Sequence, residues 1–292
     1  MDAALAASYE ECKRLNSLHG KTYYLATLLL PKNKRPYVHA LYGFARYADE
    51  IVDDLASTLS PAEKAEALRS WSSGVLADLK AGTSTDHIGR ALVDTARKFD
   101  IPHQHFVDFL HSMEMDLTIT QYQTYEDLLE YVYGSAAVIG LEMVPILGYS
   151  DQRAYEAAKK LGIAFQLANF IRDVAEDRDR GRVYLPLQEL AQFGVDRAML
   201  ERRILTPEII AALKFQIARV RQLQREADIG IAYLDKVSRP CIRAASELYC
   251  GIVDEVEAIG YDIFNKRAKT STARRARVAG AAYIQAIAAR MS

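Results

Sequence analysis

Residues 166–177 read Gln166-Leu-Ala-Asn169-Phe-Ile-Arg172-Asp173-Val-Ala-Glu-Asp177. Four polar residues in this stretch, Gln166, Asn169, Asp173 and Asp177, recur at intervals of three, four and four, which places their side chains on one face of a helix. The neighbouring positions are mostly apolar, so we expect this polar face to look into an interior space. Isolated buried carboxylates are very unfavourable, which predicts that these acids are paired or bound to a metal ion.

A second acidic stretch, Tyr42-Gly-Phe-Ala-Arg46-Tyr-Ala-Asp49-Glu-Ile-Val-Asp53-Asp54, lies nearer the N-terminus. On a helix, Asp49 and Asp53 lie one turn apart on a shared face, where their charges repel, and Tyr42 and Arg46 lie on the same stripe. One such acidic pair alone is more often a solvated face than a functional site. Two of them, neither followed after four residues by a lysine that would form a surface ion pair, favour a functional site.

Clustered oxygen donors of this kind are typical of a site for a hard cation such as Mg²⁺. In proteins Mg²⁺ is usually held by one or two carboxylates together with substrate phosphates, so the two stretches predict a diphosphate substrate. Such a site stabilises the charge of a departing diphosphate and leaves the organic part of the substrate in an apolar, water-poor cavity. The two stretches together therefore predict carbocation chemistry.

Helical periodicity extends along almost the whole chain, for example at Ala48, Ile51, Val52 and Leu55. No segment has the alternating pattern of a strand. Helix breaks are indicated at Ser60-Pro61, 82–86, 100–102, 149–151, Thr206-Pro207 and Ser238-Arg239-Pro240. We therefore predict an all-α fold in which ten or more helices form one bundle around a central cavity, as a single domain spanning residues 1–292.

The composition is that of a globular protein, with 292 residues, 50% hydrophobic and 26% charged, and a formal net charge of −1. This charge gives no overall attraction to nucleic acid. The three cysteines have no paired metal-binding spacing, and their odd number argues against a disulfide framework. The first residues lack a secretory pattern, and the apolar segments 25–30 and 136–149 fall short of the about 20 residues of a spanning helix. We therefore expect a cytoplasmic protein.

Several stretches resemble sequences of the phytoene and squalene synthase family. YADEIVDD at 47–54 and NFIRDVAEDRDRGRVYLP at 169–186 resemble the two aspartate-rich signatures of that family. The resemblance covers most of the chain, and further matching blocks are HGKTYYLATLLLP at 19–31, MEMDL at 113–117, LLEYVYGSAAVIG at 128–140 and ELYCGIVDEVEAIGYDIF at 247–264. The order and spacing are similar to those of the short bacterial members, especially phytoene synthases of actinobacterial type.

The resemblance implies a single-domain isoprenoid synthase fold that binds two prenyl diphosphates around three Mg²⁺ ions. It implies that Asp49 and Asp53 hold metal on one side, and that Asn169, Asp173 and Asp177 hold it on the other. Tyr131 matches a cavity tyrosine near the reacting carbons. The residues at positions that bind substrate in the family are His19, Thr22, Tyr42, Arg46, Gln166, Arg172, Tyr249 and Lys266.

In the family, ionisation of one substrate gives an allylic cation, which the double bond of the other attacks to form a cyclopropylcarbinyl diphosphate. A second ionisation, rearrangement and proton loss give a conjugated triene in phytoene synthases, whereas squalene synthases quench the cation with hydride from NADPH. We expect a C40 triene from two geranylgeranyl diphosphates, with no need for NADPH. Two alternatives stay open: a dehydrosqualene or squalene synthase that uses two farnesyl diphosphates, and a noncatalytic membrane-associated homologue.

Two positions depart from the family pattern. Many relatives read VAGTVG where this chain reads Ser135-Ala-Ala-Val-Ile-Gly140, so we expect Val138 to replace a small polar group in the cavity wall. Gly20 stands where relatives often have serine, which weakens one inferred phosphate contact.

Two further groups of side chains allow more than one interpretation. His103 and His105 point to different sides of a helix and have no third ligand at a recognisable spacing, so a structural role is favoured over a metal site. Arg178, Arg180 and Arg182 follow the acidic stretch at 166–177, and we favour a lid over the diphosphates to a surface charge patch.

A basic run begins with Lys266-Arg267-Ala-Lys269 and continues to Arg274, Arg275 and Arg277. Such a run is more often a solvated helix end than a contact with anionic lipid headgroups. Because the expected product is an oily hydrocarbon, we predict peripheral membrane contact without insertion.

Overall fold

The computed structural model describes residues 2–53 and 59–291, and of Asp53 it describes the backbone only. Asp54 and Leu55, which belong to the acidic stretch that begins at Tyr42 and to its apolar stripe, lie outside the described residues. Within the described ranges the structure is helical, and the β pairing there consists of two isolated bridges, Gln121 with Val183 and Tyr149 with Leu234. The predicted all-α fold class is confirmed.

The helices are joined mostly by short connections. In chain order they are α1 (Ala3–His19), α2 (Lys21–Thr27), α3 (Arg35–Asp53), α4 (Pro61–Ala81), α5 (His87–Lys98), α6 (His103–Thr118), α7 (Tyr125–Val132), α8 (Val138–Leu147), α9 (Arg153–Asp179), α10 (Leu187–Gln192), α11 (Arg197–Glu201), α12 (Pro207–Gly230), α13 (Arg239–Cys250), α14 (Ile252–Ala258) and α15 (Thr272–Met291). A π-helical turn η1 (Tyr133–Ala137) joins α7 to α8, and a 3-10 turn η2 (Ile231–Tyr233) follows α12.

Local sequence signals account for the helix ends. Ser60 caps α4 through a capping box with Glu63, Pro61 occupies its first turn, and Gly82 ends it with φ 72°. The same logic applies to Thr206, whose side chain accepts from the backbone N–H of Ile209 at the start of α12. The helix breaks predicted from the sequence are confirmed.

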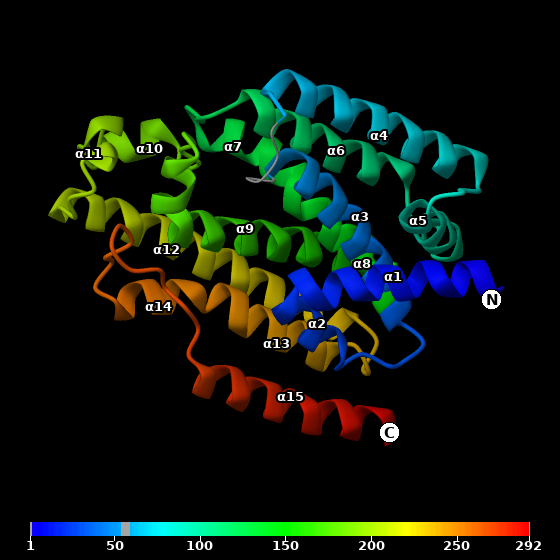
Figure 1. Cartoon of the computed structure of the whole chain (residues 1–292). Helices are drawn as coiled ribbons and strands as arrows, with labels where there is room; N and C mark the ends of the chain where they lie inside the picture. The colour runs from blue at the N-terminus through cyan, green and yellow to red at the C-terminus, as the bar shows by residue number, and fades with distance from the viewer. Residues whose placement is uncertain (1, 54–58, 292) are drawn as a thin grey trace.

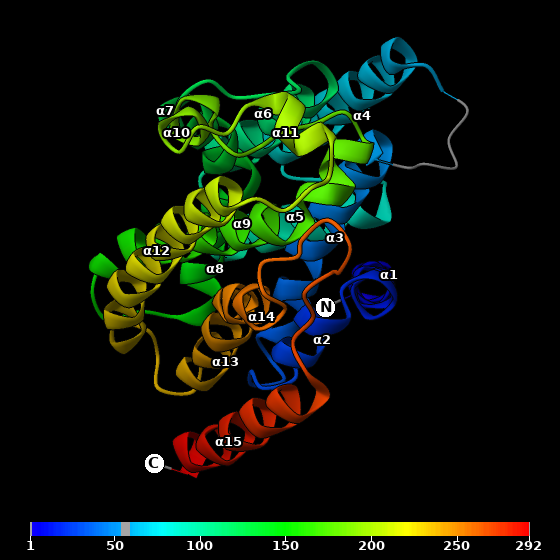
Figure 2. The same ribbon diagram turned by 90° about the vertical axis from the view of Figure 1, so that its left-hand side faces the viewer.

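Helix α9 runs through the middle of the bundle and packs against α8, α12, α13 and α14 (Figure 1). Helices α1, α3 and α5 pack against one another beside it, and α4 packs on α6. Helix α15 lies along the outside of the bundle, against α13 (Figure 2). The side chains of two apolar clusters fill the spaces between these layers; the first includes Phe44, Leu92 and Phe106, and the second includes Ile171, Leu213 and Ile217.

Among the described residues, one helical run is long and apolar enough to cross a membrane by length and composition alone, at Tyr125–Leu147. This run is longer than the apolar segment 136–149 noted in the sequence, because η1 joins α7 and α8 into one continuous helix. This run packs against α6 and α9, and 44% of its most apolar window is buried inside the bundle.

Candidate active site

The two acidic stretches face one another across a polar pocket of about 370 Å³. Helix α3 supplies one wall and α9 the opposite wall, while α6 and the α7–η1 segment contribute further side chains. The polar side chains that line the pocket are Tyr42, Arg46, Asp49, Asp116, Tyr131, Ser135, Gln166, Asn169, Arg172, Asp173, Asp177, Arg180, Arg182 and Tyr184.

On the α3 wall, the carboxylate of Asp49 is paired with a cation from the preceding turn. Arg46 Nη1 donates a 2.8 Å hydrogen bond to Asp49 Oδ2, and Arg46 Nε lies 3.8 Å from Glu50 Oε2. Asp53, predicted as the second metal ligand on this wall, ends α3, and its side chain lies outside the described residues.

On the α9 wall, Gln166, Asn169, Asp173 and Asp177 all line the pocket, as helical spacing requires. Asn169 Oδ1 is closed off from solvent and has no hydrogen-bond partner in the part of the chain that the structure describes. A buried carbonyl oxygen without a partner is energetically unfavourable in the absence of a ligand. This oxygen is therefore suited to a ligand that carries positive charge or a donor.

The two aspartates of α9 differ in their surroundings. Asp173 accepts hydrogen bonds from Arg172 Nε at 2.7 Å and from Arg172 Nη2 at 2.5 Å. Burial raises the pKa of Asp177 to about 7, and the negative charge of Asp173 adds to this rise. A cation bound between the two carboxylates would favour the ionised form of Asp177.

These donors fit Mg²⁺ as an ion that takes the rest of its ligands from a phosphate. Among the described residues, no three Asp, Glu, His or Cys side chains converge into a complete metal cage. The carboxylate and amide oxygens of Asp49, Asn169, Asp173 and Asp177 nevertheless line one pocket, and Mg²⁺ prefers such oxygens.

Asp116, which was not among the site residues predicted from the sequence, organises the pocket next to α9. Tyr131 Oη donates to one of its carboxylate oxygens and Tyr184 Oη donates to the other, at 2.6 and 2.8 Å. Arg182 Nη2 donates to its backbone carbonyl at 2.9 Å. Burial raises the pKa of Tyr131 well above 10.0, and the charge of Asp116 adds to it, so this hydroxyl stays protonated. The aspartate of the MEMDL block at 113–117 was the available signal.

Of the three arginines expected to form a lid, two line the polar pocket and one does not. Arg180 and Arg182 line the polar pocket. Helix α9 continues through Asp179, so Arg178 belongs to the helix and not to a loop, and it lies 3.2 Å from Asp179. The expected three-arginine lid is therefore corrected to two pocket-lining arginines.

Four residues expected to bind substrate are not among those that line the polar pocket: His19, Thr22, Lys266 and Tyr249, of which Tyr249 lies in the apolar cavity described below. His19 ends α1 and is exposed, and Thr22 is half-buried on α2. Lys266 Nζ lies 3.7 Å from Asp262, and its side chain is 62% exposed. Its neighbour Arg267, predicted from the sequence only as part of the basic run, forms an ion pair with Asp173 instead.

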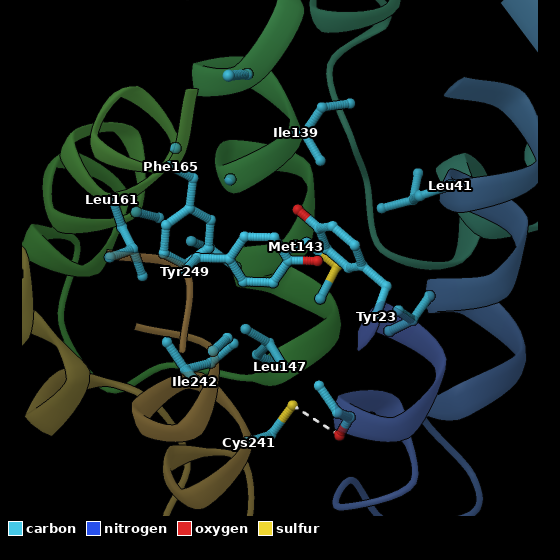
Figure 3. A pocket seen from close by; sticks show the side chains of 18 of the residues that line it. Tyr23, Leu41, Ile139, Met143, Leu147, Leu161, Phe165, Cys241, Ile242 and Tyr249 are labelled. Atoms are coloured by element: carbon cyan, nitrogen blue, oxygen red, sulfur yellow. Dashed lines mark hydrogen bonds between the residues drawn. The ribbon is translucent and has the colours of Figure 1, made fainter. Parts of the chain in front are cut away.

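An apolar cavity of about 300 Å³ adjoins the polar pocket (Figure 3). Tyr249, expected to bind substrate, lies in this cavity with its ring 4.9 Å from that of Phe165 and 5.2 Å from that of Tyr23. Cys241 Sγ donates to the carbonyl of Ala26 at 3.2 Å in the same cavity (Figure 3). Much of the remaining wall is aliphatic and includes Leu41, Ile139, Met143, Leu147, Leu161 and Ile242.

Val138 does not lie in the cavity wall, contrary to expectation. It is fully buried in the apolar core, whereas Ser135 and Ile139 line the cavity. The reason is η1: its i to i+5 hydrogen bonding turns the following side chains away from the positions that regular α-helical spacing predicts. Close packing fixes this turn, because a Cβ on Gly134 would lie 2.1 Å from the carbonyl oxygen of Asp108 on α6.

Steric crowding also explains why position 20 is a glycine. A Cβ at this position would lie 2.6 Å from Tyr42 Cε2 and 2.7 Å from Asn16 Oδ1. Tyr42 lines both the pocket and the cavity. Glycine therefore gives Tyr42 the space it needs at the boundary between the two compartments.

A helical bundle that encloses an apolar cavity next to a carboxylate- and arginine-lined pocket has the isoprenoid synthase fold. A solved dehydrosqualene synthase in complex with ligand is 27% identical, with a TM-score of 0.87 over 97% of this chain and 98% of that one. The squalene synthase HpnC from Alicyclobacillus acidocaldarius is 24% identical and shows the same fold, with a TM-score of 0.82 over 89% and 97%.

Sequence comparison narrows the class to one family. The squalene/phytoene synthase family matches residues 17–274. The 15-cis-phytoene synthase of Synechococcus elongatus is 36% identical over 94% of this chain and 91% of its own length. Phytoene synthase 2, chloroplastic, of Zea mays is 38% identical over 98% and 71%. The chain belongs to the squalene/phytoene synthase family.

Proposed function

We propose that this protein is a prenyltransferase that condenses two geranylgeranyl diphosphates head to head into a C40 triene and releases diphosphate. One observation carries the proposal: the polar pocket and the apolar cavity share part of their walls. The residues that line both are Tyr42, Ala45, Phe109, Ser135, Gln166 and Asn169. A substrate with a charged head and a long hydrocarbon tail would lie across this boundary.

The names of the relatives support the choice of a C20 substrate. The proteins from Synechococcus elongatus and Zea mays are both called phytoene synthases, and each is more than 35% identical to this chain over most of its length. By family analogy, the reaction passes through a cyclopropylcarbinyl diphosphate and ends with proton loss, so that no reductant is consumed.

The side chains of the polar pocket would bind and orient the diphosphate. Asp49, Asn169, Asp173 and Asp177, with Asp53 expected beside them, would hold Mg²⁺, which when bound neutralises charge on the diphosphate and favours its departure. Arg46, Arg172, Arg180 and Arg182 line the same pocket and provide charge-assisted donors to the phosphate oxygens.

The apolar cavity would protect the cation from water. Its wall offers aliphatic side chains and the aromatic rings of Tyr23, Phe165 and Tyr249. The π faces of such rings attract positive charge without reacting with it. Exclusion of water prevents capture of the cation as an alcohol before the proton is lost.

The test is incubation of the purified protein with Mg²⁺ and either geranylgeranyl or farnesyl diphosphate, followed by mass analysis of the extracted hydrocarbons. We expect the C40 triene from geranylgeranyl diphosphate, and no change on addition of NADPH. Consumption of farnesyl diphosphate alone, or a product two hydrogens richer with NADPH, would contradict the proposal.

The second candidate is a dehydrosqualene synthase that uses two farnesyl diphosphates. Its support is the solved dehydrosqualene synthase, whose fold matches this chain with a TM-score of 0.87. The same assay separates the two candidates, because each predicts a different substrate and a product of different mass.

We also propose that the protein contacts membranes peripherally through the outward face of α15. On this helix Tyr283, Ile284 and Met291 are 58%, 70% and 85% exposed. From residue 263 onward the chain has seven cations and no acid: Lys266, Arg267, Lys269, Arg274, Arg275, Arg277 and Arg290. An apolar helix face with nearby cations is suited to anionic headgroups.

Vesicle flotation tests this contact. Binding to anionic vesicles should exceed binding to neutral ones and should fall as salt rises, since exposed charges are screened. Ile284→Gln should weaken it. Binding that survives high salt and carbonate washing would contradict peripheral contact.

A further inference from the structure

Arg267 lies in the connection between α14 and α15 and contacts the acidic stretch at 166–177 on α9. Its Nη2 is 3.1 Å from Asp173 Oδ1, and its Nε donates to the same oxygen at 3.2 Å. Its Nη1 is 3.1 Å from Glu176 Oε1. One guanidinium therefore bridges two acids of α9, one of which lines the polar pocket.

Asp173 is paired with two guanidinium groups that differ in freedom. Arg172 is its neighbour on α9, and its side chain is only 20% exposed. Arg267 is 46% exposed and comes from a connecting segment, so it can leave Asp173 without disturbing α9. The contact between Arg267 and Asp173 is thus the one that a competing cation would break.

We propose that Arg267 is an exchangeable counter-ion that couples the binding of a divalent cation to the binding of diphosphate. This inference rests on the proposed function and concerns how the same pocket is filled. A cation that arrives alone must displace Arg267 from Asp173. When a diphosphate arrives with the cation, the displaced guanidinium finds a new anion within reach, so the two ligands bind cooperatively.

The proposal predicts effects of opposite sign for one substitution. Arg267→Gln frees Asp173, so a bare divalent cation should bind more tightly, by about five-fold or more, the lower end of typical coupling factors. The same variant should bind magnesium pyrophosphate more weakly by a similar factor, because the diphosphate loses a cationic partner. Loss of folding would weaken the binding of both ligands. Opposite changes in the two affinities therefore distinguish coupling from unfolding.

Two further variants sharpen the test. Arg267→Lys keeps the charge but loses the planar fork that bridges Asp173 and Glu176. If displacement of this contact matters, the lysine variant should also bind the bare cation more tightly, though less so than the glutamine variant. Arg277→Gln makes the same charge change on α15, where Arg277 lies 3.3 Å from Glu247, and should alter neither affinity.

Binding is measured without turnover. Mn²⁺ is titrated by the electron paramagnetic resonance of the free ion, and inorganic pyrophosphate is titrated by calorimetry at saturating Mg²⁺, with thermal melts confirming that each variant is folded. Tighter binding of Mn²⁺ together with weaker binding of pyrophosphate by Arg267→Gln would support the proposal. Unchanged or weaker Mn²⁺ binding, or a lysine variant identical to the wild type, overturns it.

The same experiment separates this inference from the proposed function. If the wild type converts geranylgeranyl diphosphate but Arg267→Gln has unchanged Mn²⁺ affinity, the coupling role fails and the function stands. If the wild type binds neither Mn²⁺ nor magnesium pyrophosphate, the proposed diphosphate site fails and the coupling role fails with it.

Discussion

Tyr131 Oη donates a 2.6 Å hydrogen bond to Asp116 Oδ2, which fixes a tyrosine of α7 to an aspartate of α6. Tyr184 donates to the second oxygen of the same carboxylate at 2.8 Å. One acid therefore orients two hydroxyl groups at the edge of the polar pocket. Both tyrosines and Asp116 line that pocket, so their arrangement bears directly on the position of a bound diphosphate.

We predict that Asp116→Asn lowers kcat by about tenfold or more while the protein stays folded. An amide offers one acceptor oxygen where the carboxylate offers two, and a hydrogen bond to a charged group is worth about 1.5–3 kcal/mol. Steady-state kinetics and thermal melting test this. Asp108→Asn on the same helix, where Asp108 accepts from Gln104 at an exposed position, is the matched control and should retain activity. Equal kinetics in the two variants would remove Asp116 from the site.

We predict that Asp49→Asn and Asp173→Asn each lower turnover by at least about 100-fold, the usual scale for removing one group that stabilises developing charge. Their effects on stability should differ. Asp49 is 47% exposed, so Asp49→Asn should change the free energy of unfolding by no more than about 0.5 kcal/mol. Asp173 is 15% exposed and pairs with two arginines, so its change should destabilise the fold by about 1 kcal/mol. Near-normal turnover of either variant at saturating Mg²⁺ would show that the metal assignment is wrong.

We predict that Ala245→Phe shifts the substrate preference from geranylgeranyl toward farnesyl diphosphate. Cys241, Ala245 and Tyr249 follow one another at four-residue spacing on α13 and all line the apolar cavity. A phenyl ring at the middle position would occupy space needed by the longer tail. Competition between the two substrates should show at least about a tenfold change in the ratio of kcat/KM, since one methylene group more or less in an apolar pocket is worth about 1–3 kcal/mol.

The control for this prediction is Ala279→Phe, on an exposed part of α15. It adds the same ring outside the cavity and should leave the substrate ratio unchanged. A ratio that is also unchanged in Ala245→Phe would mean that the tail does not reach this part of α13.

We predict that Glu142→Leu stabilises the protein. Glu142 on α8 is fully buried, and neither of its carboxyl oxygens has a hydrogen-bond partner within residues 2–53 and 59–291. Its removal should raise the free energy of unfolding at neutral pH by about 1–3 kcal/mol, the usual penalty for an unsatisfied buried polar group. Glu142 lines neither compartment, so activity should be retained. Urea unfolding measures the change, and Glu66→Leu at an exposed position of α4 is the control.

The same residue predicts a pH dependence. Burial raises the pKa of Glu142 well above 4.5, so the folded protein keeps the proton while the unfolded chain loses it. The contribution of Glu142 to the free energy of unfolding should therefore fall as pH rises above about 4.5, its ordinary value. The loss between pH 5 and 8 should be smaller in Glu142→Leu than in the wild type. An equal slope in both proteins would contradict this.

The sequence by itself determined which side chains share a helix face. Gln166, Asn169, Asp173 and Asp177 line one pocket because a helix of 3.6 residues per turn leaves no other arrangement for intervals of three and four. The helix ends were predictable for a similar reason, because each end depends on residues within one turn of it. In α4 a serine and the following proline start the helix, and a glycine ends it.

The tertiary structure decided what those faces meet. Local periodicity carries no information about partners far along the chain, such as Asp116 for Tyr184 or Arg267 for Asp173, because these pairs form only when separate helices pack. Local periodicity also gave the wrong side-chain directions within the α7–η1–α8 segment. A π turn held against α6 by the close approach of Gly134 changes the angle between successive side chains, so Val138 points into the core and Ser135 faces the site.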